Sequence, residues 1–489
     1  MTSKTFFLDQ HGCAKNQVDG ELIITRLENL GFKRTEDASC ADLIIVNSCG
    51  FIESAKTESL NSLMQAKDSY PNAKIVLAGC LAERYADVFK DNLPEADAVF
   101  GNGDMSKLDG VVDSLFKGER PVVKEEQRGV CCGDRNTLLS FKGSAYVKIT
   151  EGCDNRCTFC AIPLIRGTLR SRPVDEIVDE IKLLLSRGVY EINLIGQDLA
   201  AFGCGKDDVS FSDKEFSWHD VLYSKLKEPV IADPDFSSKY GDSELLTLIK
   251  KISLLPGNFW VRLLYIHPDH FNPDILDFMK TDSRFLPYFD IPFQSGSDSI
   301  IKSMNRKGQS KDYVSLVRKI REVFPESCIR TTFLTGFPGE SEKNAEETKS
   351  FLKEIQSDWS GCFSYSLEED TPAYKMKHRV PHKKAEKRSL ELQEIQAEIT
   401  ACRLKERTGK TYDVLVEEIV QNAEEGSDEG LAIGRAWFEA PEVDGSVVIR
   451  YDLSDPRSVA SVQEGNVVKV KVVSSSAVDL DGMLLLGED

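Results

Sequence analysis

The residues best suited to chemistry are three cysteines in one short run, Cys153, Cys157 and Cys160. They are spaced four and then three residues apart, so a single loop can bring three thiolates to one point. A four-iron four-sulfur cluster usually takes four thiolates, and a group of only three leaves one iron with an open coordination position for a small chelating molecule. The spacing therefore predicts an iron–sulfur site that performs chemistry in addition to storing electrons.

A zinc site completed by histidine is the alternative for this triplet. Zinc knuckles pair their ligands as C-x2-C with a second pair downstream, whereas no His lies between Cys153 and Cys160 or close on either side. The three cysteines are therefore interpreted as cluster ligands.

A second group of cysteines, Cys13, Cys49 and Cys80, follows three predicted strands at residues 5–8, 42–47 and 73–77. These strands alternate with amphipathic stretches, which is the pattern of a parallel α/β domain. Such sheets place functional groups beyond the carboxyl ends of their strands, and each cysteine has a neighbouring glycine that lets the backbone approach closely. The three loops are expected to gather three thiolates for a second cluster. The alternative is that each cysteine is a small buried residue at a strand end.

The length and cysteine content of the chain fit a large metal-dependent enzyme. A chain of 489 residues predicts two to four domains. Thirteen cysteines are few for this length and odd in number, which favours metal ligands over disulfides. The N-terminus has no apolar signal region, and no stretch approaches eighteen consecutive apolar residues. We therefore expect a cytoplasmic protein with no membrane partner.

A second α/β series begins near Ser144. Its predicted strands cover residues 144–150, 190–196, 259–266, 288–293, 328–336 and 362–368. The helix expected from Val174 to Leu185 has the apolar spacing of one buried stripe. The economical architecture is a partial parallel (β/α)6 barrel, with its chemistry at the carboxyl ends of the strands. The Cys153 loop follows the first of these strands.

Two segments of the chain, one before and one within this second series, show no clear apolar periodicity. The charged stretch from Gly118 to Leu139 is interpreted as a linker, and the adjacent Cys131 and Cys132 within it as spare thiols, because neither triplet needs them. Residues 205–240 are interpreted as an insertion of unknown role.

The C-terminal part of the chain is acidic. A helix from about Lys383 to Arg407 leads to short strands that alternate with Gly and Asp turns, which indicates a small β-barrel. Residues 410–489 hold seventeen Asp and Glu against six Lys and Arg, and so carry −11 of the net charge of −19. Nucleic-acid affinity comes mainly from Lys and Arg that neutralise phosphates. The acidity therefore favours a basic partner, unless it serves only solubility.

Together, the two cysteine triplets and the terminal barrel resemble the radical S-adenosylmethionine methylthiotransferases, over nearly the whole chain. The resemblance divides the chain into an N-terminal α/β domain at 1–125, a radical S-adenosylmethionine core at 139–402 and a TRAM-like β-barrel at 405–489. The runs Cys13–Asn16 and Asn47–Lys56 are similar to the branch of the family that modifies a ribosomal protein. Further similar runs are 288–292, 330–333, 336–340 and 371–374.

The chain departs from that branch in places that spare the six cysteines. Ser295 stands where the branch commonly has His, Ala14 replaces Pro, and the segment after Cys204 is longer than usual. No catalytic side chain is assigned beyond the cluster ligands.

The resemblance implies two [4Fe–4S] clusters, one on each triplet, and S-adenosylmethionine bound at the open iron of the Cys153 cluster. Cleavage of S-adenosylmethionine would give a radical that abstracts hydrogen from an unactivated carbon. The second cluster would present a methylated sulfur to the resulting carbon radical. Each turnover would consume two S-adenosylmethionine molecules. The implied substrate is the β-carbon of an aspartate on ribosomal protein twelve of the small subunit, a basic protein. Reduced flavodoxin or ferredoxin is the expected electron donor, and transfer RNA is not expected as a partner.

Five residues at strand ends are candidates to contact S-adenosylmethionine. Gln197 and Asp198 end the second predicted strand of the barrel, and Thr332, Gly336 and Glu340 lie near the end of the fifth. The alternative for the second group is ordinary turn chemistry around Gly336.

Three other functions stay open at this point. A transfer-RNA adenine methylthiotransferase would use the same clusters but predicts basic patches on the barrel, where Lys469 and Lys471 are too few. A non-catalytic iron–sulfur protein would need neither a six-stranded barrel nor an open iron. A zinc-binding interaction protein would contain zinc in place of about eight irons.

Overall fold

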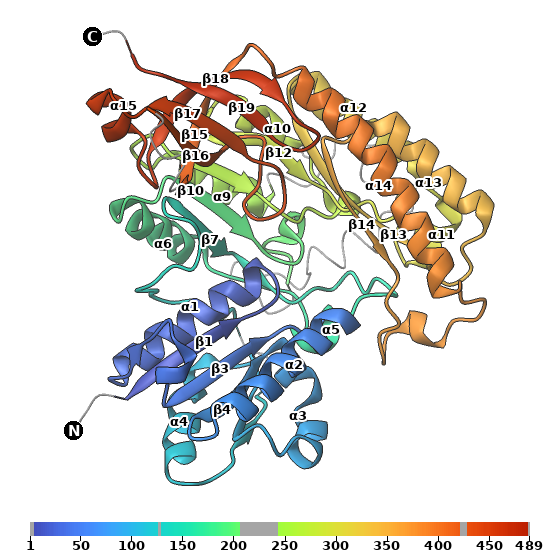
Figure 1. Cartoon of the computed structure of the whole chain (residues 1–489). Coiled ribbons are helices and arrows are strands. Elements are labelled where there is room, and N and C mark those ends of the chain that lie inside the picture. Colours follow the sequence, from blue (N-terminus) through green and yellow to red (C-terminus); the bar gives the residue numbers. More distant parts are fainter. Residues whose placement is uncertain (1–3, 126–128, 206–242, 421–427, 488–489) are drawn as a thin grey trace.

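Three large β-sheets organise the chain into an N-terminal lobe, a central domain and a terminal barrel (Figure 1). The computed structural model describes residues 4–125, 129–205, 243–420 and 428–487. The insertion of unknown role lies, from residue 206 onward, outside the described residues. Among the helices that are described, none combines the length and apolar character needed to cross a membrane.

The N-terminal lobe is a six-stranded parallel sheet in the order β2-β1-β3-β4-β5-β6. Its strands are β1 (Thr5–Gln10), β2 (Lys33–Arg34), β3 (Leu43–Ser48), β4 (Lys74–Gly79), β5 (Ala98–Phe100) and β6 (Val122–Val123), and its helices are α1 (Ala14–Asn29), α2 (Glu53–Ser69), α3 (Cys80–Asn92) and α4 (Leu108–Phe116). Strands β1, β3 and β4 confirm the three predicted from sequence. The linker prediction was wrong at its start, because Val122 and Val123 pair with β5; a two-residue strand carries no alternation that a sequence could reveal.

The central domain is an open sheet of six parallel strands in the order β14-β13-β12-β11-β10-β7, which confirms the partial (β/α)6 barrel. The strands are β7 (Ser144–Lys148), β10 (Glu191–Ile195), β11 (Trp260–Leu263), β12 (Phe285–Asp290), β13 (Cys328–Thr335) and β14 (Trp359–Ser364). The helices are α5 (Ile162–Ile165), α6 (Val174–Ser186), α9 (Glu244–Ser253), α10 (Asp274–Met279), α11 (Asp298–Ser303), α12 (Ser310–Val323), α13 (Glu342–Ile355) and α14 (His382–Lys405). A short antiparallel pair, β8 (Thr150–Glu151) and β9 (Arg170–Ser171), brackets the Cys153 loop.

The terminal barrel is closed by five strands in the order β15-β16-β17-β19-β18, as the predicted small β-barrel requires. Its elements are β15 (Thr411–Val420), β16 (Glu429–Ala436), β17 (Val447–Asp452), α15 (Pro456–Ser461), β18 (Val467–Ser475) and β19 (Leu480–Leu485). Closure leaves no unpaired strand edge among these elements.

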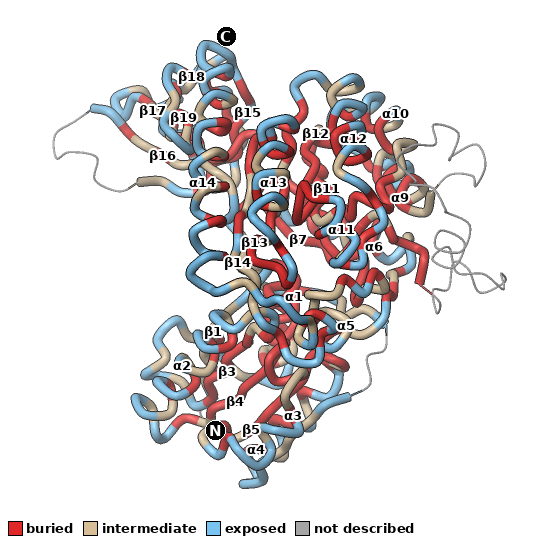
Figure 2. Tube along the Cα trace, turned by 90° about the vertical axis from the view of Figure 1, so that its right-hand side faces the viewer, coloured by how far each residue is buried: buried red, intermediate tan, exposed pale blue. Residues whose placement is uncertain are grey.

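The two faces of the central sheet are buried against different partners (Figure 2). Successive side chains of a strand point to opposite faces. On β7, Ala145 and Val147 join the core under the helices, whereas Tyr146 joins a core shared with the terminal barrel. The segment after β16 reaches the sheet directly: Trp359 donates to the Phe438 carbonyl at 3.0 Å. The terminal barrel is therefore packed against the central domain and shares a hydrophobic core with it.

A buried ion network fixes this contact. The Glu191 carboxylate at the start of β10 accepts from Arg262 at 2.9 Å and from Arg435 of the terminal barrel at 2.7 Å. Burial raises the pKa of Glu191, but the two guanidinium groups outweigh it and hold this pKa well below the ordinary value. Arg435 also contacts Glu417 at 2.6 Å.

Glu439, in the same interface, predicts a pH-dependent stability. Burial raises the pKa of its carboxyl from 4.5 to about 8, and only one oxygen is hydrogen-bonded, to the Ala436 amide at 2.8 Å. An acid with a raised pKa takes up a proton on folding, so its contribution falls as pH rises from about 4.5 to about 8, by at most about 1.4 kcal/mol per pH unit. Glu439→Gln should therefore raise the melting temperature more at pH 8 than at pH 5. The exposed Glu464→Gln is the control, and an equal effect of Glu439→Gln at both pH values would contradict the prediction.

Candidate metal centres

Cys13, Cys49 and Cys80 meet at the carboxyl edge of the N-terminal sheet, as the strand-end rule predicts. Cys13 precedes α1, Cys49 follows β3, and Cys80 opens α3 directly after β4. Their thiols are close enough to influence each other's ionisation. Burial raises the pKa of Cys80 to about 12, and the charges of Cys13 and Cys49 add to the rise while Arg166 opposes it.

Two glycines permit this approach of the loops. A Cβ on Gly50 would lie 2.6 Å from the Cys80 carbonyl oxygen, and one on Gly12 would lie 3.2 Å from the Cβ of Cys49. Gly12 also has a φ of +89°, which disfavours any side chain. The cysteine loops therefore depend on these positions having no side chain.

Asn16 holds the three loops together. Its amide nitrogen lies 2.8 Å from the His11 carbonyl oxygen and 3.2 Å from that of Ser48, so it bridges the Cys13 and Cys49 loops. Its amide oxygen accepts from the Cys80 thiol at 3.7 Å. In the sequence, Asn16 stands out only as part of a family motif. Its role in joining the loops depends on the fold, which brings the His11 and Ser48 carbonyls and the Cys80 thiol around its side chain.

The Cys153, Cys157 and Cys160 loop is pinned on several sides. The Cys153 amide donates to Gly167, and the Thr158 amide and hydroxyl donate to Met304 and Ser303 at 3.1 and 2.9 Å. Burial raises the pKa of Cys160 to about 12, with the charge of Cys157 adding to it. These three thiols are therefore grouped and held before any metal binds.

Buried polar side chains surround Cys157. His267 Nε2 lies 3.9 Å from its sulfur, and His267 Nδ1 accepts from the Asp269 amide at 3.2 Å, which places the ring proton on Nε2. Burial and then Arg306 lower the pKa of His267 to about 3, so the ring is neutral. Arg306 lies against the same sulfur and counters part of the rise that burial causes in the pKa of Cys157.

Asp198, His267 and His270 form a compact group, with ligand atoms within 4.8 Å of one another. The Asp198 carboxylate already accepts from Asn155 at 2.9 Å and contacts His270 Nδ1 at 2.7 Å. Because Asn155 belongs to the Cys153 loop, this group supports the loop through the Asp198 carboxylate.

The two cysteine sites are joined by a buried ion network. Arg166, which follows α5, contacts Asp19 of α1 at 2.8 Å and also Glu151. Lys148 on β7 contacts Asp19 and, at 2.8 Å, Glu151. Arg166 Nη2 also lies 3.1 Å from the Cys80 sulfur. One guanidinium therefore links the base of the Cys153 loop to a ligand candidate of the other site.

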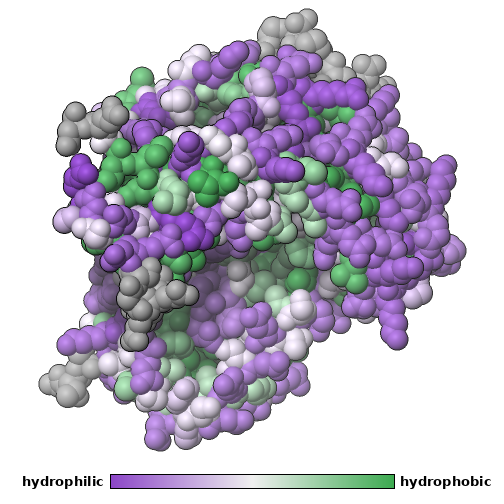
Figure 3. Space-filling view, turned by 45° about the horizontal axis from the view of Figure 1, so that its top comes forward, coloured by the Kyte–Doolittle hydropathy of each residue, from purple (hydrophilic) through white to green (hydrophobic). Residues whose placement is uncertain are grey.

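A cavity of about 820 Å³ opens between the two sites. It is lined by Phe51 and Ile52 after Cys49, by Phe159 between Cys157 and Cys160, and by residues of β13, β14 and α14. Figure 3 shows hydrophobic residues inside the hollow between the N-terminal lobe, at the bottom, and the rest of the molecule.

The structure separates the five candidates for S-adenosylmethionine contact into two groups. Thr332 and Gly336 line the cavity, and neither end of the buried Gln197 amide has a hydrogen-bond partner among the described residues. The carboxylate of Asp198 is engaged as described above, and that of Glu340 accepts from the Gly336 amide at 2.5 Å and from Arg388 at 2.7 Å. Thr332 and Gln197 therefore have side-chain polar atoms to offer a ligand, whereas the Gly336 amide and the carboxylates of Asp198 and Glu340 are occupied by the protein itself.

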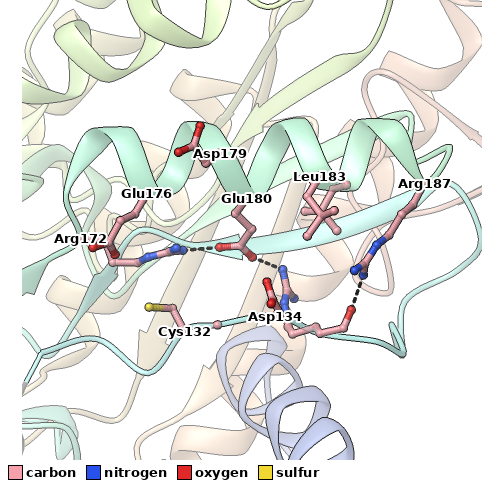
Figure 4. Close-up of a pocket in the computed structure, with 11 residues that line it drawn as sticks. Cys132, Asp134, Arg172, Glu176, Asp179, Glu180, Leu183 and Arg187 are labelled. Carbon is pink, nitrogen blue, oxygen red and sulfur yellow. Dashed lines mark hydrogen bonds and ion pairs between the residues drawn. The ribbon is translucent and has the colours of Figure 1, made fainter.

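A smaller pocket of about 430 Å³ lies over α6, away from the six cysteines (Figure 4). Its charges pair with one another: Glu180 contacts Arg172 at 2.5 Å and also Arg135, and Arg187 donates to the Arg135 carbonyl. Cys132 lines this pocket, while the Cys131 thiol donates to the Asn102 carbonyl at 3.3 Å. The pocket offers no chemistry comparable to that of the cysteine sites.

Comparison with known proteins matches all three parts of the chain. Residues 5–101 match the model of Uncharacterized protein family UPF0004, residues 147–352 the Radical SAM superfamily and residues 408–485 the TRAM domain. Ribosomal protein uS12 methylthiotransferase RimO of Treponema denticola is 51% identical over 97% of this chain and 100% of its own. Proteins of the same name from Carboxydothermus hydrogenoformans and Thermotoga maritima are 34% and 36% identical, over 98% and 90% of this chain and 98% and 92% of theirs. Among solved structures, the methyltransferase TsrM of Kitasatospora setae aligns over 76% of this chain and 75% of its own, with 14% identity and a TM-score of 0.47.

The fold and the site define a radical S-adenosylmethionine enzyme. Within that class, the chain belongs to the RimO family of ribosomal protein uS12 methylthiotransferases. The family assignment confirms the resemblance to the ribosomal-protein branch and implies S-adenosylmethionine and two [4Fe–4S] clusters.

The cysteine sites fit such clusters. Each gathers three thiols, the number that leaves one iron of a [4Fe–4S] cluster open. Cys80 and Cys160 have raised pKa values, so both thiols are neutral without a cation, and a bound metal would deprotonate them. Each site also has a buried arginine against one sulfur, Arg166 at Cys80 and Arg306 at Cys157, to offset the charge of the thiolates.

Asn16 provides a test of the N-terminal site. Asn16→Ala removes the amide that joins the His11 and Ser48 carbonyls, while Gln10 still donates to His11 at 2.8 Å, and each lost hydrogen bond costs about 0.5–1.5 kcal/mol. Anaerobically reconstituted Asn16→Ala protein should therefore hold about four irons in place of about eight. Asn92→Ala, on the exposed side of α3, should keep the full content. A full iron content in Asn16→Ala would show that Asn16 does not position the site.

Proposed function

We propose that this protein transfers a methylthio group to the β-carbon of an aspartate on ribosomal protein uS12. In this proposal Cys153, Cys157 and Cys160 hold the [4Fe–4S] cluster that binds S-adenosylmethionine, and Cys13, Cys49 and Cys80 hold the second cluster. The observation that supports the proposal is that residues next to both three-thiol sites, Phe51 and Ile52 after Cys49 and Phe159 between Cys157 and Cys160, line one cavity, while Arg166 joins the two sites. Relatives matching nearly the full chain and named for this activity support it.

The clusters and S-adenosylmethionine, when bound, supply the C–H activation and the sulfur and methyl groups that amino-acid side chains lack. The chain itself provides the ligands and their surroundings. Phe51, Ile52 and Phe159 wall the cavity with apolar surface beside the two sites, which limits the access of water to reactive groups. The unpaired amide of Gln197 and the hydroxyl of Thr332 are the polar groups that we assign to S-adenosylmethionine.

The substrate's carboxylate has a suitable partner at the cavity. Arg379 lines it and is exposed, so its guanidinium can pair with an aspartate that enters from solvent. The exposed Glu53 lines the same cavity and can contact a basic residue beside that aspartate, whereas the buried Glu368 is already paired with Lys56 and Arg84.

The charges of the terminal barrel favour a basic protein over transfer RNA. Of the six Lys and Arg in residues 410–489, five are already paired with carboxylates, among them Arg457 with Asp455 and Lys469 with Asp413. A surface whose cations are neutralised in this way has little left for phosphates, whereas its surplus carboxylates attract lysine and arginine. We assign the cytoplasm as the location, because the proposed substrate is a ribosomal protein. We assign reduced flavodoxin or ferredoxin as the electron donor, because the cluster must be reduced before S-adenosylmethionine is cleaved.

The direct test offers the reconstituted, dithionite-reduced enzyme S-adenosylmethionine with either uS12 or transfer RNA, and follows both by mass spectrometry. A methylthio mass gain on a single aspartate of uS12 is the expected result. A gain on transfer RNA alone would refute the substrate assignment.

Cysteine variants separate the two sites in the same assay. Cys49→Ala should lose methylthio product while still cleaving S-adenosylmethionine, and Cys153→Ala should lose both. Cys40→Ala removes an exposed thiol far from both sites in the fold and should behave as the unmodified enzyme. Methylthio product from Cys49→Ala would contradict the role of the second cluster.

A further inference from the structure

Arg166 links the two cysteine sites, and one of its contacts is not needed to balance the buried charges around it. Asp19 and Glu151 supply two negative charges to the buried network, and Lys148 and Arg166 supply two positive ones. The network is neutral before Cys80 is considered. The remaining contact, from Arg166 Nη2 to the Cys80 sulfur at 3.1 Å, therefore needs a reason other than pairing a buried carboxylate.

The position of Arg166 in the chain makes this contact informative. Arg166 follows α5, which begins two residues after Cys160, and its partner Glu151 lies two residues before Cys153. The pair thus closes the Cys153 loop at its base. Ala161 and Ile165 of the same segment pack against Cys80, and Figures 1 and 2 both place α5 beside the N-terminal lobe.

We infer that Arg166 is a positioning residue that sets the reduction potential of the N-terminal cluster through its hydrogen bond to the Cys80 sulfur. The inference rests on the proposed two-cluster function. A hydrogen bond to a ligand sulfur and a nearby positive charge both stabilise the reduced, more negative state of an iron–sulfur cluster, and so raise its potential. Because burial keeps water from Arg166, its charge acts with little screening.

Arg135 offers a matched comparison. It is also a buried arginine that joins α1 to the central domain, through Glu21 at 2.5 Å and Glu180. Among the described residues its side chain makes no hydrogen bond to any of the six candidate ligand cysteines. Removing Arg135 tests the effect of losing a buried cation at the same interface. It leaves the donor to Cys80 in place.

The experiment measures the N-terminal cluster alone. In the full-length chain, Cys153, Cys157 and Cys160 are changed to alanine, the remaining cluster is reconstituted, and its midpoint potential is determined by titration followed by electron paramagnetic resonance. Arg166→Gln is then added, and separately the charge-neutral pair Glu151→Gln with Arg166→Gln, which leaves Lys148 paired with Asp19. Arg135→Gln is the control.

We expect a lower midpoint potential in both Arg166 variants and the parent value in Arg135→Gln. Loss of iron from both Arg166 variants, with full iron in Arg135→Gln, would overturn the inference, because Arg166 would then be needed to retain the cluster and not to set its potential. The second donor to the Cys80 sulfur, the Asn102 amide at 3.5 Å, stays in place in every variant. An intact cluster at the parent potential in either Arg166 variant would overturn it. A parent protein that binds no iron would instead refute the proposed second cluster.

Discussion

The structure depends on a buried ion network between the N-terminal lobe and the central domain. Asp19, Lys148, Glu151 and Arg166 are all nearly inaccessible to solvent. Removing charges from water is costly, and such networks often add little to stability compared with apolar packing. Their value lies in geometry, because each charge has few satisfactory positions. Here the geometry fixes the Cys153 loop against the Cys80 site, and the proposed chemistry requires that the two remain together.

Buried polar contacts also fix the position of the terminal barrel on the central sheet. Arg435 bonds to Glu191 on β10, and Trp359 donates to the segment after β16. The barrel is thus held by specific polar contacts over an apolar interface. The C-terminal residues 410–489 carry seventeen Asp and Glu against six Lys and Arg, which suits a substrate rich in lysine and arginine.

The cysteine sites were predictable because local rules define them. The triplet lies within eight residues of sequence, and Cys13, Cys49 and Cys80 follow from the strand-end rule. The start of α1 at Ala14 could not be read from the apolar period, because Lys15, Asn16 and Asp19 are buried and interrupt it. They are buried because α1 lies between its own sheet and the central domain: Lys15 donates to the Gly196 carbonyl at 3.0 Å. The Arg166 to Cys80 contact spans 86 residues and could not be read from either motif. Among the predicted cofactor contacts, polarity alone could not separate Gln197, which has no partner among the described residues, from Glu340, which has two.

The central claim is that two three-cysteine sites, linked through Arg166 and each next to one shared cavity, hold two [4Fe–4S] clusters close together. The most direct test compares the electron paramagnetic resonance spectrum of the reduced, reconstituted wild-type chain with spectra of the two proteins that each lack one triplet. The account predicts two [4Fe–4S] signals in the wild type, broadened by interaction between the clusters, so that its spectrum differs from the sum of the other two. A wild-type spectrum equal to that sum, or one that shows a single cluster, would contradict it.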